Sequence, residues 1–265
     1  LTIVGTTDGD NKSVINANGH SLFDMTNAGT TVEVKDTKIT GATTIANVAD
    51  GNELILDNSV LTGGALANAG DITLKNTNSI ASNVTGTGTT TVTTGITTLE
   101  NGSTLSQGEL SIVSGATYVN EGTTSAKLTS NSNLTNNSTF NVAGGTNNST
   151  ISGTNGILNI TGDFENASTG TITDNKVVIS SGKTFKNDGA ITLAGLETTS
   201  EGSGIFNTQN SRVQTMNLGD VKLDSDLSWL LDAKLAGGLT TVSDNIKANS
   251  FSGDGNIVIN GINIL

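Results

Sequence analysis

Residues 68–74 read NAGDITL and residues 187–193 read NDGAITL, so the pattern N-x-G-x-I-T-L occurs twice in this chain. Residues 155–160 (NGILNI) and 255–260 (GNIVIN) are looser copies of the same pattern. In each copy a short apolar run lies next to polar turn residues. A unit of about twenty residues built in this way cannot bury its apolar side chains alone, so copies must stack on one another. The repeat therefore predicts a solenoid of about thirteen coils.

Apolar runs of this kind return along the whole chain, flanked by Gly, Asn or Asp, which predicts short strands separated by turns. The chain has no proline, which suits a continuously hydrogen-bonded sheet. We therefore expect an all-β fold. The predicted strands are residues 1–4, 31–34, 53–56, 71–74, 110–113, 157–160, 177–179, 190–193 and 256–259.

The composition indicates a thin core inside a polar sheath. Thr, Asn, Gly and Ser number 44, 33, 33 and 26 of 265 residues, whereas hydrophobic residues make up 34% and aromatic residues 3%. Ile, Val and Leu should point inward, and Asn side chains at the turns can form hydrogen-bonded ladders between coils. Thr suits the outer strand positions because it is β-branched.

Two stretches give a period of two, which is typical of strands. In the run Thr85–Thr98, threonines alternate along one face at positions 87, 89, 91 and 93. In residues 222–235, one parity holds Leu223, Leu227, Trp229, Leu231, Ala233 and Leu235, and the other holds Asp224, Asp226, Ser228, Asp232 and Lys234. We interpret both stretches as strands.

Charge and cysteine content exclude several classes of function. The net charge is −12, from 12 basic and 24 acidic residues, and Arg212 is the only arginine, so the chain lacks the basic surface that nucleic acids require. Cysteine is absent, which excludes thiolate chemistry, Cys-based zinc sites and iron–sulfur ligation. No apolar run approaches the roughly 20 residues that span a bilayer, so we expect no membrane insertion by this segment.

The residues that carry chemistry are few. His20 is the only histidine, and its context Asn18-Gly19-His20-Ser21 favours an exposed turn over a catalytic or metal role. Pairs of acids could bind calcium, but no calcium-loop spacing is present, and solvated carboxylates are the preferred interpretation. The acids concerned are Asp8 and Asp10, near Asn11, and the trio Asp220, Asp224 and Asp226.

Aromatic residues are too scattered for a sugar-stacking platform, so we expect the phenylalanines to fill the coil interior. The residues concerned are Phe23, Phe140, Phe164, Phe185 and Phe206. The dense threonines of residues 85–98 could order water, as in β-helical ice-binding proteins, but they do not form a strict Thr-x-Thr ladder. From these residues we assign no catalytic, cofactor-binding or metal site and expect no cofactor.

The C-terminal part of the chain resembles the end of an autotransporter passenger domain. The resemblance lies in residues 226–235 (DLSWLLDAKL), 241–246 (TVSDNI) and 252–265 (SGDGNIVINGINIL), and upstream in the Gly- and Asn-rich residues 151–166. It implies a right-handed, single-stranded parallel β-helix with a C-terminal β cap that helps nucleate folding. The resemblance further implies that residues 1–220 form parallel coils. Residues 221–265 would then form the terminal coils and the cap, continuous with the helix.

The resemblance also implies export across the outer membrane of a Gram-negative bacterium, and hence an extracellular or cell-surface location. The outer-membrane barrel that accompanies such passengers is expected beyond residue 265. We expect a non-enzymatic protein that acts in adhesion, self-association or host interaction, with a host or matrix macromolecule or a second copy as its partner. The alternatives are a spacer that presents another domain and a β-helical enzyme that acts on polysaccharide along a groove.

Overall fold

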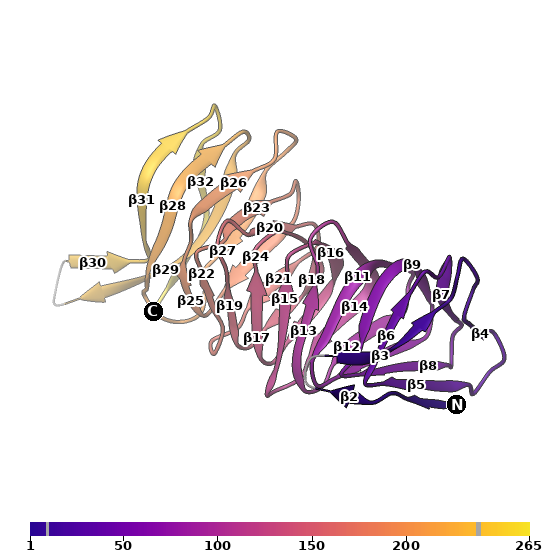
Figure 1. The fold of residues 1–265 in the computed structure, drawn as a ribbon. Helices are drawn as coiled ribbons and strands as arrows, with labels where there is room; N and C mark the ends of the chain where they lie inside the picture. The colour runs from indigo at the N-terminus through magenta and orange to yellow at the C-terminus, as the bar shows by residue number, and fades with distance from the viewer. Residues whose placement is uncertain (9–10, 237–239) are drawn as a thin grey trace. The chain divides into compact units, whose positions relative to one another are not determined.

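A computed structural model describes residues 1–8, 11–236 and 240–265. Within these ranges all regular structure is β, in strands β1 to β32, and no helix occurs. Apart from two antiparallel pairs, the strands pair in parallel and stack as a β-solenoid of about 11 turns (Figure 1). The predicted all-β parallel solenoid is confirmed. The chain divides into two compact units, Leu1–Thr139 and Phe140–Leu265.

The first unit consists of three columns of parallel strands, and several long strands bend at a corner and contribute to two columns. One column holds β1 (Thr2–Val4), β5 (Thr31–Lys35), β8 (Glu53–Asp57), β10 (Asp71–Lys75), β12 (Thr89–Val92) and the ends of β14 (Thr104–Ile112) and β16 (Thr123–Ser130). The next holds β3 (Asn11–Asn16), β6 (Thr37–Thr40), β9 (Val60–Asn68), β11 (Asn78–Thr85), β13 (Gly95–Leu99), β15 (Ala116–Asn120) and β17 (Asn133–Asn136). The third holds β4 (Phe23–Met25), β7 (Thr44–Val48) and the remaining halves of β9, β11, β14 and β16, while β2 (Thr7–Asp8) pairs antiparallel with β3.

The second unit repeats this arrangement. One column holds β20 (Ile157–Ile160), β23 (Lys176–Ile179), β26 (Gly195–Thr198) and the ends of β28 (Thr215–Leu223) and β31 (Asn245–Ser252). The next holds β19 (Thr150–Ser152), β22 (Thr171–Thr173), β25 (Ala190–Thr192) and the beginnings of β28 and β31. The third holds β18 (Thr139–Asn147), β21 (Phe164–Asn166), β24 (Thr184–Asn187), β27 (Gly204–Asn207), β29 (Leu227–Ala236) and β32 (Ile257–Ile264), and β30 (Thr240–Ser243) pairs antiparallel with β29.

Coil length varies along the chain. Asp71 pairs with Thr89, which gives a coil of 18 residues, and Phe206 pairs with Trp229, which gives 23. The terminal coils are longer, because Ile3 pairs with Val34 and Trp229 pairs with Ile259, 31 and 30 residues apart. The predicted count of thirteen coils was therefore too high.

The two copies of N-x-G-x-I-T-L occupy equivalent places in their own units. Asn68 and Asn187 are 1% and 0% exposed, and the Ile and Leu of each copy are also buried. Gly70 and Gly189 are needed because a Cβ at either position would collide with carbonyl oxygens of the preceding coil, Ala49 and Gly170 respectively. In each of the two coils that carry it, the motif therefore supplies a buried asparagine, a close backbone contact and two core residues.

Buried asparagines form the predicted ladders. In the second unit Asn147 donates to Asn166 and Asn166 donates to Asn187, each at 2.8 Å between Nδ2 and Oδ1. In the first unit Asn120 donates to Asn136 in the same way. Each amide thus satisfies the next, so these polar groups are buried without losing their hydrogen bonds.

Asn68 is a buried asparagine that lies outside these ladders. Its Nδ2 donates to Gln107 Oε1 at 2.6 Å, but its Oδ1 has no partner among the described residues. The coil before it places Val48 at the paired position, and valine has no donor to offer. The preceding coil therefore supplies no side-chain donor to the Asn68 oxygen.

Aromatic side chains fill one corner of the second unit. The rings of Phe164 and Phe185 are stacked 6.2 Å apart, and those of Phe185 and Phe206 are 5.6 Å apart. Trp229 continues this column in register with Phe206. Of the phenylalanines predicted to be core residues, Phe140, Phe164, Phe185 and Phe206 are buried as expected, and Phe23 is half-buried.

Both patterned stretches are β, but each is broken by a corner. Residues 85–98 extend over the end of β11, all of β12 and most of β13, with Thr90 and Thr97 buried. Residues 222–235 divide between β28 and β29, and the apolar parity is buried as predicted up to Ala233; the side chain of Leu235 lies outside the described residues. On the polar parity, Asp224 is exposed as expected, whereas Ser228 and Asp232 are buried, so this parity does not face water along its whole length.

The last coil continues the columns of the core without being covered. Ile259, Ile262 and Ile264 lie in register with the buried Trp229, Leu231 and Ala233, yet are 54–66% exposed. Phe251 pairs with the buried Val221 and is 61% exposed. In the described residues, the antiparallel pair β29–β30 is the feature at this end that departs from parallel stacking.

Candidate binding groove

A polar groove lies on the column β22–β25–β28 of the second unit. Its volume of about 470 Å³ is in the range of small-ligand sites. The floor consists of the outer faces of these strands, and one wall is the loop of residues 208–214 between β27 and β28. The lining residues are Ser168, Thr169, Gly170, Thr171, Gly189, Ala190, Ile191, Thr192, Arg212, Val213, Gln214, Thr215 and Asn217.

A second hollow continues this groove toward β31. The two share Thr192 and Asn217, and Lys247 and Asn249 belong to the second. Thr173 pairs with Thr192, Thr192 with Asn217, and Asn217 with Lys247, so these four residues form one row across neighbouring strands. Because adjacent strands lie about 4.8 Å apart, the row offers a polar group at each such step. We call the two hollows together the polar groove.

Two buried carboxylates hold the loop that walls the groove. Asp232 and Asp244 are 0% and 3% exposed. Asp232 Oδ2 accepts from the backbone N–H groups of Asn210 and Arg212, at 2.7 and 3.2 Å. Asp244 accepts from the Gln214 N–H at 2.9 Å and from the Thr208 hydroxyl at 2.6 Å. A buried carboxylate is stable only when its oxygens are satisfied, so these bonds fix both the acids and the loop.

Trp229 is joined to the same network. Its indole N–H donates to Thr208 Oγ1 at 3.0 Å, and Thr208 in turn donates to Asp244. Asp244 also accepts from the backbone N–H of Asp232 at 2.9 Å. The aromatic column of the core is thus connected to the groove wall by hydrogen bonds.

The loop also contacts the turn at residues 187–189. A terminal guanidinium nitrogen of Arg212 donates to the Asp188 carbonyl, and Gln214 Nε2 donates to the Asn187 carbonyl at 3.2 Å. Arg212 is exposed, and the other donors of its guanidinium have no partner among the described residues. It therefore presents a fixed, partly unpaired cation at the edge of the groove.

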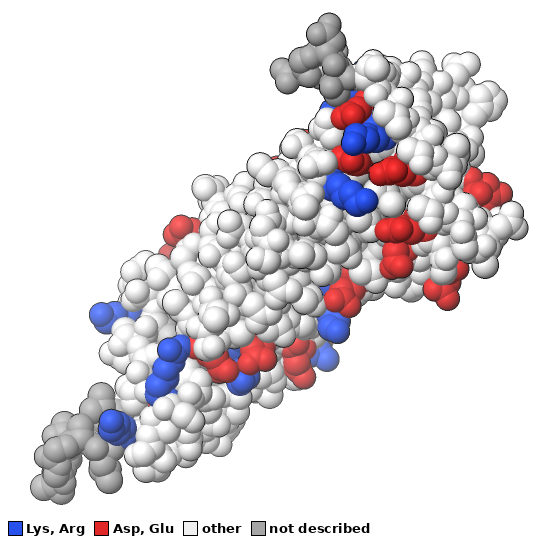
Figure 2. All heavy atoms as spheres, turned by 90° about the horizontal axis from the view of Figure 1, so that it is seen from below, with Lys and Arg blue, Asp and Glu red and all other residues white. Residues whose placement is uncertain are grey.

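Elsewhere in the described residues Lys35, Lys176, Lys186 and Lys222 form ion pairs with acids, and much of the face seen in Figure 2 is uncharged. Lys186 contacts Asp188 and Glu165, with nitrogen–oxygen distances of 2.7 and 2.8 Å. Hydrogen bonds to Asp188 and then to Glu165 raise the pKa of Lys186, so it stays protonated. Asp188, whose neighbour Gly189 lines the groove, is thereby paired with a lysine.

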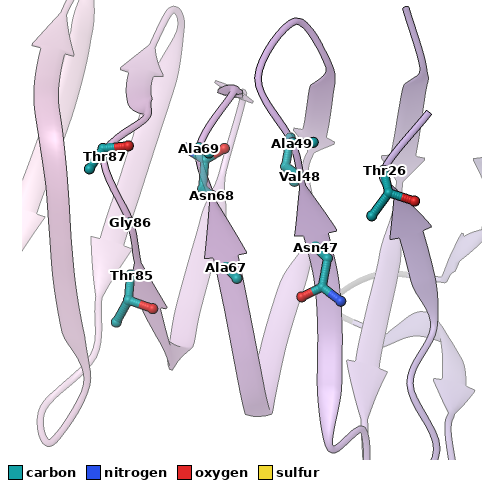
Figure 3. A pocket seen from close by; sticks show the side chains of 10 residues that line it. All are labelled: Thr26, Asn47, Val48, Ala49, Ala67, Asn68, Ala69, Thr85, Gly86 and Thr87. Carbon is teal, nitrogen blue, oxygen red and sulfur yellow. The ribbon is translucent and has the colours of Figure 1, made fainter. Parts of the chain in front are cut away.

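A different groove, on the first unit, is small and uncharged. Asn47, Ala67 and Thr85 form a row on β7, β9 and β11, and Figure 3 shows their side chains side by side on successive strands. The rest of the lining carries no charge and consists of Thr26, Val48, Ala49, Asn68, Ala69, Gly86 and Thr87. This groove therefore has no charged group that could orient a ligand.

The candidate residues from the sequence do not converge on one site. His20 is exposed next to the turn at Asn18-Gly19, as predicted. Asp220 accepts from Ser250, Asp224 pairs with Lys222, and Asp226 accepts from Asn256, so the three acids have separate partners. The Asp10 position and the side chain of Asp8 lie outside the described residues.

A search of the described residues finds no group of three or more His, Cys, Asp or Glu side chains placed to hold a metal ion. In the same residues, none of the segments is a helix with the length and apolarity needed to cross a bilayer. The polar groove has hydroxyls, amides and two cations in its described lining, and no carboxylate or imidazole. Such a lining can form hydrogen bonds and neutralise a negative charge.

Comparison with protein-family models, with curated proteins and with solved structures finds no match to this chain.

Sequence reasoning missed the polar groove. In the sequence Arg212 stands out only as the single arginine, and Lys247 lies 35 residues further along the chain. Asp232 and Asp244 are two of 24 acidic residues, and nothing in their sequence context sets them apart. The long 23-residue coil between Phe206 and Trp229 was the available hint of an inserted loop.

Proposed function

We propose that this chain is a passenger of the autotransporter type, located outside the cell or on its surface, which acts in adhesion or host interaction without catalysing a reaction. The observation that supports this most directly is the character of its surface. Three of the described hollows have linings dominated by Thr, Ser, Asn, Ala and Gly side chains on stacked strands. Such surfaces suit contact with an extended macromolecule.

Self-association is a second form of the same function. The net charge of −12 makes copies repel one another at low ionic strength, and salt screens this repulsion. Association that increases with salt would support this form. A monomer at every salt concentration would exclude it.

The test uses the whole chain on beads. Beads that carry residues 1–265 are applied to immobilised matrix proteins, to polysaccharides and to beads carrying the same chain. Adhesion to at least one of these surfaces, above that of beads with an unrelated protein of equal negative charge, is the expected result. Absence of binding to every surface would overturn the adhesive function and favour a spacer.

Deleting a coil separates the adhesive function from the spacer. Asp71 pairs with Thr89 and Thr89 with Glu109, so deleting residues 89–108 brings the Glu109 coil next to the Asp71 coil in register. A spacer tolerates such a deletion at any coil. An adhesive chain loses binding when the deletion removes the binding face and keeps it otherwise, so deletions in the two units should differ.

A further inference from the structure

We propose that the polar groove of the second unit binds an acidic oligosaccharide, one that carries carboxylate or sulfate groups. This inference rests on the proposed function and names the ligand class for one of its surfaces. The charge of the groove, its hydrogen-bonding groups and its lack of aromatic residues favour such a ligand.

The charge of the groove is opposite to that of the chain. The chain has 24 acidic and 12 basic residues, yet the only charged residues in the described lining are Arg212 and Lys247. Lys247 is exposed and has no hydrogen bond or ion pair among the described residues. Two cations that have no ion pair, at separate places in one groove, favour a ligand with more than one negative group.

Arg212 is positioned for this role. Its backbone N–H is bound by Asp232, and its guanidinium is held by the Asp188 carbonyl. A guanidinium can bind a carboxylate or sulfate through two parallel N–H groups. Because the backbone and one end of the side chain are already fixed, little conformational entropy is lost when an anion binds.

The space between the two cations is lined by groups that suit sugar hydroxyls. Thr192 and Asn217 are exposed and lie in the row that ends at Lys247. Thr171 and Gln214 add a hydroxyl and an amide near Arg212. Hydroxyls and amides both donate and accept, so they can bind a polyol whose hydroxyls do the same.

The lining contains no Phe, Tyr or Trp among its described residues. Stacking on aromatic rings, which neutral sugars and nucleic-acid bases use, is therefore missing from this groove. A nucleic acid would also need a longer series of cations along its phosphates. A sugar chain with acidic groups uses both of the features that the groove does offer.

The experiment measures binding of the whole chain by titration calorimetry to two acidic sugars, oligogalacturonate and a sulfated heparin oligosaccharide. Maltohexaose is the neutral control and inorganic polyphosphate the anion without sugar hydroxyls. We expect at least one acidic sugar to bind about tenfold tighter than either control, since charge-assisted and neutral hydrogen bonds then add. Failure of both acidic sugars to bind, or equally tight binding of polyphosphate, would overturn the inference.

Charge-matched variants locate the site. The double variant Arg212→Gln with Lys247→Gln should weaken acidic-sugar binding by about tenfold or more, because each cation contributes a charge-assisted bond. The control variant Lys75→Gln with Lys127→Gln removes two positive charges from the first unit and should change affinity less than about threefold. An equal loss in both variants would show a general effect of charge and would overturn the site. Circular dichroism and Trp229 fluorescence verify that both variants fold.

The bead assay separates this inference from the proposed function. If the Arg212→Gln, Lys247→Gln chain still adheres to the surface that the unmodified chain binds, the polar groove is not the binding site, and the adhesive function stands. If the unmodified chain adheres to none of the surfaces yet binds an acidic sugar through these two residues, the inferred binding at the groove is supported and the adhesive function is wrong.

Discussion

Asn166 Nδ2 lies 2.8 Å from Asn187 Oδ1, although 21 residues separate the two along the chain. Both side chains are fully buried. Each buried amide in the ladder uses its neighbour in the next coil as its partner, so the stacking of coils is what makes these polar residues tolerable in the core.

Replacing Asn166 with alanine should therefore be costly. The change leaves Asn147 Nδ2 without one acceptor and Asn187 Oδ1 without its donor, both in the interior. We expect a loss of about 2–4 kcal/mol in unfolding free energy, measured by urea denaturation. The control is Asn159→Ala, because Asn159 donates to Asn141 at 2.8 Å on a half-buried outer position and should cost less than about 1 kcal/mol. Equal losses would show that the ladder adds no stability of its own.

The aromatic column should be the most sensitive part of the second unit to loss of volume. Phe185 is fully buried between Phe164 and Phe206. Phe185→Ala should lower the unfolding free energy by about 3–5 kcal/mol, because it removes apolar contacts and leaves a cavity. The matched change Phe251→Ala, at a position 61% exposed, should stay within about 0.5 kcal/mol. A large effect at Phe251 would contradict the described exposure of the last coil.

Neutralising Asp244 should disturb the groove wall more than removing a negative charge from an exposed position does. In Asp244→Asn one of the two acceptor oxygens becomes an NH2 group, which then faces the donors Thr208 and Asp232 N–H or Gln214 N–H. We expect a loss of about 2–3 kcal/mol and a change in Trp229 fluorescence, since Trp229 is the only tryptophan and donates to Thr208. Asp220→Asn removes the same charge from an exposed position and is the control. Identical spectra for the two variants would argue against the network.

The single tyrosine provides a test of pH dependence. Burial raises the pKa of Tyr118, although its hydrogen bond with Thr124, 2.9 Å long, partly opposes this effect. In the unfolded chain the pKa is about 10, so the unfolded state loses the proton first as pH rises. The stability that Tyr118 contributes is therefore fully present below about pH 10 and is lost as the pH increases above it.

In an absorbance titration, tyrosinate should accordingly appear only as the chain unfolds, as monitored by circular dichroism. Tyr118→Phe should remove the signal entirely, since no other tyrosine is present. A reversible titration near pH 10 in the folded chain would contradict the burial of this side chain.

Much of the fold could be predicted because it depends on local patterns. All nine predicted strands occur as β structure, and the repeated Asn-x-Gly and Ile-Thr-Leu segments have equivalent environments in their own units. The period of two fixed which side of each strand is apolar, and the polar turns fixed where strands end. The predicted number of coils was too high because loops such as residues 208–214 lengthen some coils without altering the strand pattern.

The groove could not be predicted, for a physical reason. Arg212, Asn217 and Lys247 are brought together by pairing between β28 and β31 and by bonds from Asp232 and Asp244 to the loop. None of these partners is a neighbour in sequence, and burial of Asp232 depends on residues 20 or more positions away. The sequence by itself determined a stacked all-β chain with an apolar interior, because each short segment carries its own periodicity. The tertiary structure alone decided which polar residues share a surface, because that depends on the register between coils and on the loops that lie over them.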